Sequence, residues 1–163
     1  MAQEAHRPEQ TTSVLTHRTG LQDANIAGNV HGGHIMKLCD DAAAIAAVRL
    51  AGGRVVTATV DGMRFRSPVH VVDLITLRAT VNAVWRTSME VGVRVDSEDL
   101  RSGEIKHTLS AYFMMVALDG DEKALPLPPL DPVTAEDQRR HREACLRREV
   151  RLAKPGELRR TTG

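Results

Sequence analysis

The longest apolar stretch of the sequence begins at His34 and ends before Gly52 and Gly53. Its length and its many alanines favour a helix over a strand, and the two glycines end it. Apolar residues fall on most sides of this helix, which indicates a central, buried element. Its small side chains would let it lie close against a sheet or a second helix.

Strand patterns follow the helix. They cover residues 54–65, 73–85, 88–96 and 104–119. In the third stretch, valine and methionine alternate with polar residues such as Glu90, so one face is apolar and the other polar. Residues 99–104 carry the turn formers of a hairpin, and residues 13–20 are a candidate for a shorter strand. Because no helix interrupts the four long strands, we expect a mainly antiparallel sheet.

The skeleton is therefore an α+β fold in which a long central helix is wrapped by a mainly antiparallel sheet, the hotdog arrangement. A lone copy would expose much of the helix and an edge strand, so we expect a dimer. Thr134 and Asp137 form a capping box for a charged C-terminal helix, which lies on the surface or on a neighbouring subunit. One domain, residues 12–153, is flanked by a flexible N-terminus (1–11) and a flexible tail (154–163).

Composition narrows the function classes. The formal net charge is +1 and only 2% of residues are aromatic, which favours neither electrostatic nor stacking contacts with nucleic acid. No apolar run is long enough to cross a membrane, and the first residues lack the apolar core of a signal peptide. Cys39 and Cys145 lie far apart, as in proteins of a reducing compartment. We expect a cytoplasmic protein without nucleic-acid or membrane partners.

The sequence His31-Gly32-Gly33 stands directly before the helix. This position places unpaired backbone N–H groups and the positive end of the helix dipole together. Because glycines let a ligand approach the backbone closely, Gly32 and Gly33 are candidates for stabilising the oxyanion of an acyl-transfer reaction. The alternative is that the glycines only permit a tight turn.

Asp40 is the better catalytic candidate of the two helix aspartates. Its neighbours at helical spacing are apolar, whereas Asp41 lies four residues after Lys37, which can neutralise it. A carboxylate in an apolar setting can act as a general base or a nucleophile. The alternative is a structural carboxylate paired with an arginine.

Gly33 and Asp40 are separated by about 10 Å along a helix that rises about 1.5 Å per residue. One carbonyl cannot contact both groups of the same chain, so we expect Asp40 to act on a substrate held by the partner subunit's glycine turn. Asn25, in the loop before that turn, is a candidate for orienting a water molecule. The alternative for Asn25 is a turn-forming role.

Metal and thiol chemistry are the weaker alternatives. His31 and His34 with Asp40 provide too few ligands on one side, so no metal is expected. Cys39 and His34 are five residues apart and fall on different helix faces, so Cys39 is expected to be an inert buried thiol.

Four stretches resemble the hotdog-fold acyl-CoA thioesterases, and most closely the cytosolic acyl-CoA hydrolases that include the tandem-domain brain acyl-CoA hydrolase. They are DANIAGNVHGGHIMKLCDDAAAIAA, RVVTATVDGMRFRSPVHVVD, RTSMEVGVRV and SAYFMMVALD, within residues 13–150. The resemblance implies hydrolysis of fatty acyl-CoA to free acid and CoA, with Asn25 and Asp40 as catalytic residues and oxyanion-binding N–H groups in residues 31–33. Met114 stands where many relatives have a threonine, so it lacks that polar contact.

In this family, coenzyme A lies along strands at the subunit interface. The matching basic and hydroxyl residues here are Arg64, Arg66, Arg86, Thr87 and Ser88. The alternative for each arginine is a solvated surface position. The resemblance also implies a homodimer that assembles into a trimer of dimers, with no cofactor other than the CoA of substrate and product.

Two rival functions remain open. An acyl-CoA hydratase would keep the fold and use a histidine base, for which His31 and His34 are available. A non-catalytic acyl-CoA sensor would bind the thioester and release no thiol.

Overall fold

The computed structural model describes residues 4–153 and contains the predicted helix and sheet. The elements in chain order are α1 (Pro8–Thr11), β1 (Ser13–Arg18), the 3-10 helix η1 (Leu21–Asp23), α2 (Gly32–Ala51), β2 (Val55–Phe65), β3 (Leu74–Val84), β4 (Ser88–Glu98), β5 (Ile105–Ala117) and α3 (Ala135–Ala153). The strands form one sheet in the order β1-β3-β4-β5-β2, with every neighbouring pair antiparallel. The expected α+β class, with a C-terminal helix added, is confirmed.

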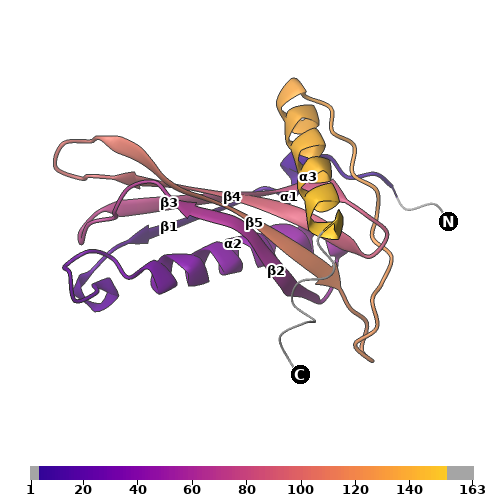
Figure 1. Cartoon of the computed structure of the whole chain (residues 1–163), viewed down its shortest axis with the longest axis horizontal. Helices are drawn as coiled ribbons and strands as arrows, with labels where there is room; N and C mark the ends of the chain where they lie inside the picture. The colour runs from indigo at the N-terminus through magenta and orange to yellow at the C-terminus, as the bar shows by residue number, and fades with distance from the viewer. Residues whose placement is uncertain (1–3, 154–163) are drawn as a thin grey trace.

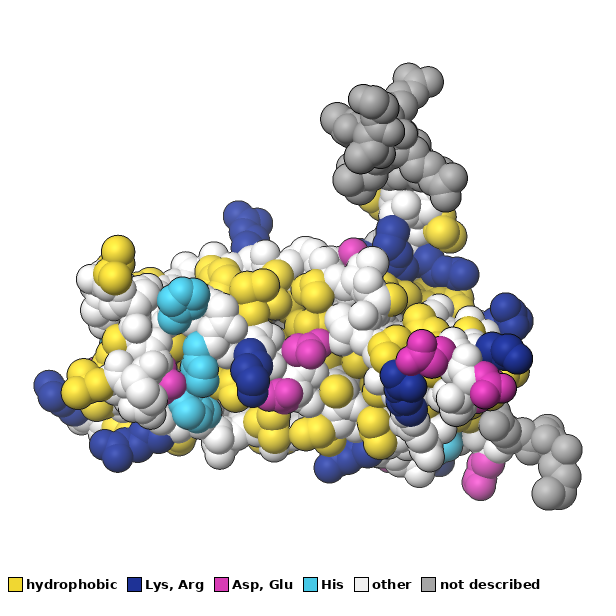
Figure 2. Space-filling view, turned by 90° about the horizontal axis from the view of Figure 1, so that it is seen from below, with side chains coloured by type: hydrophobic (Ala, Val, Ile, Leu, Met, Phe, Trp, Pro, Cys, Tyr) yellow, Lys and Arg dark blue, Asp and Glu magenta, His cyan; other side chains and the backbone are white. Residues whose placement is uncertain are grey.

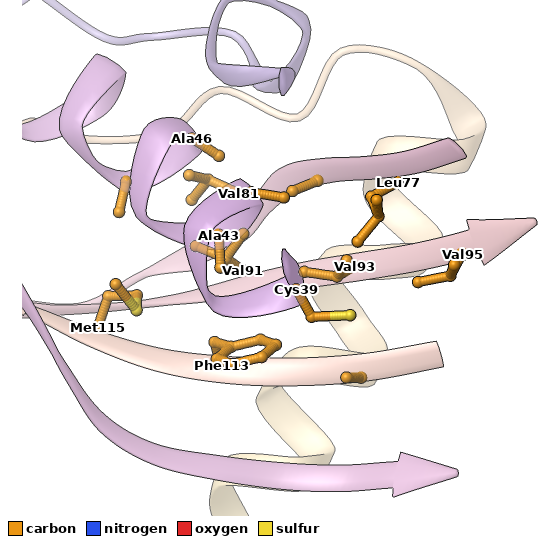
Figure 3. Packing of buried hydrophobic residues seen from close by; sticks show 14 of the residues in the cluster. Cys39, Ala43, Ala46, Leu77, Val81, Val91, Val93, Val95, Phe113 and Met115 are labelled. Atoms are coloured by element: carbon orange, nitrogen blue, oxygen red, sulfur yellow. The ribbon is translucent and has the colours of Figure 1, made fainter. Parts of the chain in front are cut away.

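Helix α2 covers one face of the sheet, and α3 lies on the opposite face (Figure 1). The buried side of α2 is made of small residues, which let the helix approach the strands closely. Figure 3 shows Cys39, Ala43 and Ala46 of α2 above the apolar side chains of the sheet. Those sheet residues include Leu77, Val81, Val91, Val93, Val95, Phe113 and Met115. The alternating apolar positions of β3 and β4 therefore form the core, as their pattern predicts.

Helix α2 begins at Gly32, two residues before the predicted start at His34. The reason is His31, whose side chain accepts a hydrogen bond from the backbone of Gly33 and so serves as the N-cap. At the other end, Gly52 takes a positive φ of 66° and ends the helix.

Helix α3 is fixed to the outer face of the sheet by a buried ion pair. Glu90 of β4 is fully buried, and its carboxylate lies 2.7 Å from Nη2 of Arg147 in α3. Asn82 Nδ2 donates to the same carboxylate at 3.1 Å, and the Arg147 guanidinium stacks over the Tyr112 ring. The sequence pattern places Glu90 on an outward polar face, but α3 covers that face. The predicted capping box of Thr134 and Asp137 is confirmed by two reciprocal hydrogen bonds of 3.1 Å.

The N-terminal segment is more ordered than the expected flexible stretch 1–11. Residues Pro8–Thr11 form the short helix α1, and Thr11 is fully buried. The Thr11 hydroxyl donates to Pro8 O at 2.7 Å and accepts from Val81 N at 3.0 Å, which anchors the segment to β3. The expected flexible tail, 154–163, lies outside the described residues.

Strand β2 forms one edge of the sheet, and much of it is exposed. Val60 and Phe65 of β2 are 43% and 45% exposed, as are Met36 and Val48 of α2 at 45% and 44%. Figure 2 shows hydrophobic side chains spread over this side of the molecule. Within residues 4–153, no helix has the length and apolar character needed to span a bilayer.

Candidate active site

The start of α2 forms one half of the candidate active site. Gly32, the first residue of the helix, opens onto a cavity of about 430 Å³ whose walls include Asn25, Phe65 and Arg66. A Cβ atom at Gly32 would lie 3.5 Å from the Phe65 ring. A side chain at this position would therefore fill space that the glycine leaves to a ligand. The backbone N–H groups of a helix start suit a developing oxyanion.

The two glycines do not offer their N–H groups equally. Gly33 N donates to Nδ1 of His31 at 3.0 Å. The prediction that both glycines present unpaired N–H groups is therefore wrong for Gly33, because the imidazole ring already satisfies that donor. The backbone N–H of Gly32 is the remaining glycine donor at the helix start.

Asn25 has a turn-forming role in the loop that precedes the helix. Its Oδ1 accepts hydrogen bonds from the backbone N–H groups of Ala27 and Asn29, at 2.9 and 3.3 Å. These contacts identify which end of the amide is the oxygen. Asn25 lines the cavity together with Gly32. Its NH₂ group is thus the part of the amide that can donate to a water molecule or a carbonyl.

Asp40 lies two turns further along α2, facing strand β2. It is half-buried, and its Oδ1 accepts a 2.6 Å hydrogen bond from the hydroxyl of Thr57 in β2. Within residues 4–153, no arginine lies within ion-pair distance of Asp40, whereas the predicted pairing of Asp41 with Lys37 is confirmed at 3.3 Å. Sequence reasoning missed Thr57, because a threonine in a strand rich in β-branched residues carries no signal of its own.

Asp40 and the cavity at Gly32 are separate in one chain. Asp40 is not among the residues that line the cavity. Both residues belong to the continuous helix α2, so their separation along its axis is about 12 Å at about 1.5 Å per residue. A thioester carbonyl in contact with the Gly32 N–H therefore lies out of reach of the same chain's Asp40.

The five residues expected to bind coenzyme A form two groups at opposite ends of the sheet. Arg64 pairs with Ser110 of β5, and Ser88 pairs with Val116 of the same strand. Those partners are six positions apart along an extended strand, a distance of about 20 Å. Arg66 lies with the first group, at the cavity, and Arg86 and Thr87 lie with the second, in the β3–β4 turn. One chain does not bring all five residues together.

Two ionisable groups near the site have shifted pKa values. Burial raises the pKa of the Cys39 thiol to about 12, and the charge of Asp40 adds to the rise. Cys39 is fully buried and therefore stays a neutral, unreactive thiol, as the sequence predicts. Beside the helix start, the hydrogen bond from His17 lowers the pKa of the Asp23 carboxyl, although burial of the group opposes the shift.

Comparison with known proteins identifies the family. The model of the thioesterase superfamily matches residues 27–104. Protein VdlD of Helicobacter pylori is 37% identical over 143 residues, which cover 88% of this chain and 82% of VdlD. The rat cytosolic acyl coenzyme A thioester hydrolase is 35% identical over 133 residues, covering 80% of this chain and 35% of that longer protein.

Solved structures agree. An apo-hexameric acyl-CoA thioesterase superposes with a TM-score of 0.91 at 34% identity, covering 94% of this chain and 98% of the other. The acyl-CoA hydrolase of Staphylococcus aureus, solved with butyryl coenzyme A and coenzyme A, gives 0.89 at 28% identity, covering 97% and 96%.

Alanine variants of one asparagine, one aspartate and one threonine of the Staphylococcus aureus enzyme have also been solved. The same numbers of residues separate those three positions as separate Asn25, Asp40 and Thr57 here. The chain belongs to the thioesterase superfamily, among the hotdog-fold acyl-CoA thioesterases that its sequence motifs resemble.

Proposed function

We propose that this protein hydrolyses fatty acyl-CoA to a free acid and coenzyme A. The observation that carries the proposal is the Asp40 carboxylate, which a threonine hydroxyl holds at the exposed edge of the sheet. A carboxyl group fixed at an open apolar edge is what activation of a water molecule or direct attack on a thioester needs. The matching order and spacing of Asn25, Asp40 and Thr57 with residues altered in the Staphylococcus aureus enzyme support this assignment.

The active site we propose is shared between two copies of the chain. Strand β2 is an exposed edge, and antiparallel pairing of two such edges would bring the helix start of one copy towards Asp40 of the partner subunit. The separation of Gly32 and Asp40 within one chain supports this arrangement. A homodimer would then hold two sites, and the hexameric relatives support further assembly into a trimer of dimers.

The reaction follows from these groups. The thioester carbonyl oxygen accepts the Gly32 N–H, and Asn25 donates to the attacking water. Asp40 of the partner subunit takes a proton from that water while the water oxygen bonds to the carbonyl carbon. The C–S bond breaks, and the proton passes to the CoA sulfur, so the products are the acid and the free thiol. If Asp40 attacks directly, water hydrolyses the resulting anhydride. Neither route transfers electrons, so neither needs a redox cofactor.

The same arrangement would bring the two groups of residues expected to bind coenzyme A close together. In an antiparallel β2 pair, the end of β2 that bears Arg64 and Arg66 lies near the β3–β4 turn of the other copy, which supplies Arg86 of the partner subunit. Arginines suit the phosphates of the nucleotide because they form paired, charge-assisted hydrogen bonds. We place this hydrolysis in the lipid metabolism of the cytoplasm, which the cytosolic rat relative supports.

The direct test is thiol release from acyl-CoA by wild-type protein and by Asp40→Asn. We expect turnover to fall by at least about 100-fold while CoA binding is kept, because the amide cannot accept the proton. The matched control is Asp41→Asn, which removes the neighbouring carboxylate that pairs with Lys37 and should stay near wild-type turnover. Near-normal turnover of Asp40→Asn would contradict the assignment.

Saturated acyl-CoA of several chain lengths separates the rival functions. A hydratase cannot release thiol from a saturated substrate, and a sensor would bind it without turnover. The two histidines that a hydratase could use as its base have other partners in the structure. His31 caps α2 through Nδ1, and His34 contacts Asp23 through Nε2.

A further inference from the structure

Three potential metal ligands from different elements meet beside the start of α2. His17 is the second-last residue of β1, Asp23 is the last residue of η1, and His34 lies in the first turn of α2. His17 Nε2 is 2.9 Å from Asp23 Oδ2, and His34 Nε2 is 3.3 Å from Asp23 Oδ1. The two Nε2 atoms are themselves 3.3 Å apart. The ligand atoms of all three side chains lie within 4.8 Å of one another.

These separations match the edges of a metal coordination shell. Zinc binds histidine nitrogen and carboxylate oxygen at about 2.0–2.1 Å in a tetrahedron, so neighbouring ligand atoms lie about 3.3–3.4 Å apart. The two nitrogens lie 3.3 Å apart, close to that edge length. Each faces a different oxygen of Asp23, Oδ2 at 2.9 Å from His17 and Oδ1 at 3.3 Å from His34, so the carboxylate would bind through both oxygens. The ring centroids are 5.0 Å apart with a tilt of 55°, so the imidazoles do not stack.

Protons alone satisfy this cluster poorly. For both histidines to donate to Asp23, each must carry its proton on Nε2, and then neither Nε2 can accept from the other. The 3.3 Å contact between the two nitrogens is then repulsive. A divalent cation between them attracts a lone pair from each side chain and outweighs the repulsion among the three, with neutral imidazoles and an anionic carboxylate as ligands.

Asp23 is held in the orientation that such a site requires. It is only 5% exposed, and its Oδ2 accepts a hydrogen bond from Gly20 N at 2.8 Å. Its backbone carbonyl accepts from His31 N at 2.7 Å. Contacts of this kind orient the ligands of metal sites. The two histidine side chains are 30% and 29% exposed, so a metal and a fourth ligand such as water can enter from solvent.

We propose that His17, Asp23 and His34 bind one divalent cation of the zinc class, which ties β1 and η1 to the start of α2. Histidine side chains gather at one end of the surface seen in Figure 2. In the sequence, His31, His34 and Asp40 are the candidate metal ligands, and they are too few to form a metal site. The fold supplies different partners for His34, from residues 17 and 23 earlier in the chain. The loop of Asn25 lies between two of the ligands, so the cation stabilises the geometry of the cavity.

Metal binding tests the proposal without any measurement of turnover. Untagged protein is dialysed against a chelator, and Zn²⁺ binding is then followed by titration calorimetry and by elemental analysis after gel filtration. We expect one Zn²⁺ per chain, and Co²⁺ should give the visible absorption of a tetrahedral or five-coordinate site. His17→Gln and His34→Gln should each weaken Zn²⁺ binding by at least about 100-fold. His70→Gln is the control, because His70 also contacts an aspartate, Asp73, but has no third ligand beside it among residues 4–153.

Thermal unfolding supplies a second measurement. At a Zn²⁺ concentration of about 100 times Kd, the Tm of wild-type and His70→Gln protein should rise by about 5 °C or more. The Tm of folded His34→Gln should not change. Stoichiometric binding that survives in both His17→Gln and His34→Gln would overturn the proposal. Binding of less than about 0.1 Zn²⁺ per chain by wild-type protein would overturn it too.

Discussion

At the scale of single residues, Thr57 holds Asp40 through its hydroxyl. Thr57→Val keeps the branched shape and removes the donor. We expect kcat to fall about 10- to 100-fold, because a hydrogen bond to a charged group is worth about 1.5–3 kcal/mol. KM should change little, since the hydroxyl acts on the carboxylate and not on the substrate. Steady-state kinetics measure both, and Thr57→Ser should keep most of the turnover. Equal losses of kcat in the two variants would show that the Thr57 hydroxyl does not support turnover.

The two cysteines should react very differently with a thiol reagent. Burial raises the pKa of Cys39 to about 12, so its reactive thiolate is absent until the pH approaches that value. Cys145 lies half-exposed on α3. We expect an aromatic disulfide reagent to modify one thiol per native chain between pH 7 and about 9 and two after denaturation. Cys145→Ser should abolish the native reaction. Rapid modification of Cys39 in the folded protein would contradict its burial.

Sequence reasoning selected Asp40 and Asn25 as candidates because both stand in an unusual local context, a carboxylate in an apolar helix and an amide before a glycine turn. It could not find Thr57 or the metal ligands His17 and Asp23. Their significance arises from side-chain contacts between different elements, which the pattern within one element does not specify. The pairing of Gly33 with His31 was missed for another reason, since capping depends on the rotamer of the His31 side chain and not on spacing alone.

At the scale of elements, the buried Glu90–Arg147 pair determines where α3 lies. Arg147→Ala leaves a buried carboxylate without its cation, and we expect the free energy of unfolding to fall by about 3–5 kcal/mol. Chemical denaturation measures this loss. Arg142→Ala, on the exposed side of the same helix, should stay within about 0.5 kcal/mol of wild type.

The double variant Glu90→Leu/Arg147→Leu should recover much of that stability, because no buried charge remains. A loss below about 1 kcal/mol in Arg147→Ala would mean that water reaches Glu90 when α3 is in place. Near-UV circular dichroism of Trp85 reports the position of α3 independently, since Arg148 of that helix lies over the Trp85 ring.

Hydrophobic periodicity predicted the long elements well. The alternating residues of β3 and β4 and the alanine-rich face of α2 are buried where the pattern places them. The pattern failed at α1, which is four residues long and is stabilised by the tertiary hydrogen bond of Thr11. It also misplaced Glu90, because period-two alternation says which residues share a face but not whether a helix covers the second face.

At the scale of the whole molecule, a single chain leaves an apolar surface exposed to solvent. Strand β2 and helix α2 both present large exposed hydrophobic side chains, among them Val60 and Met36. Val60→Asp should therefore shift the protein from an oligomer to a monomer in light scattering and abolish turnover together with it. A monomeric variant that hydrolyses acyl-CoA at the wild-type rate would show that one chain contains a complete site.

Mixing two inactive variants tests the shared site directly. Asp40→Asn and Asn25→Ala each disable every site of their own homodimer. If a site takes Asn25 from one chain and Asp40 from the partner, a mixed dimer contains one site with both residues intact and one with neither. Random assembly makes half of the dimers mixed, so co-refolded protein should regain about one quarter of the wild-type turnover. If each chain builds its own site, every site in the mixture lacks one residue, and turnover stays at the level of the parent variants.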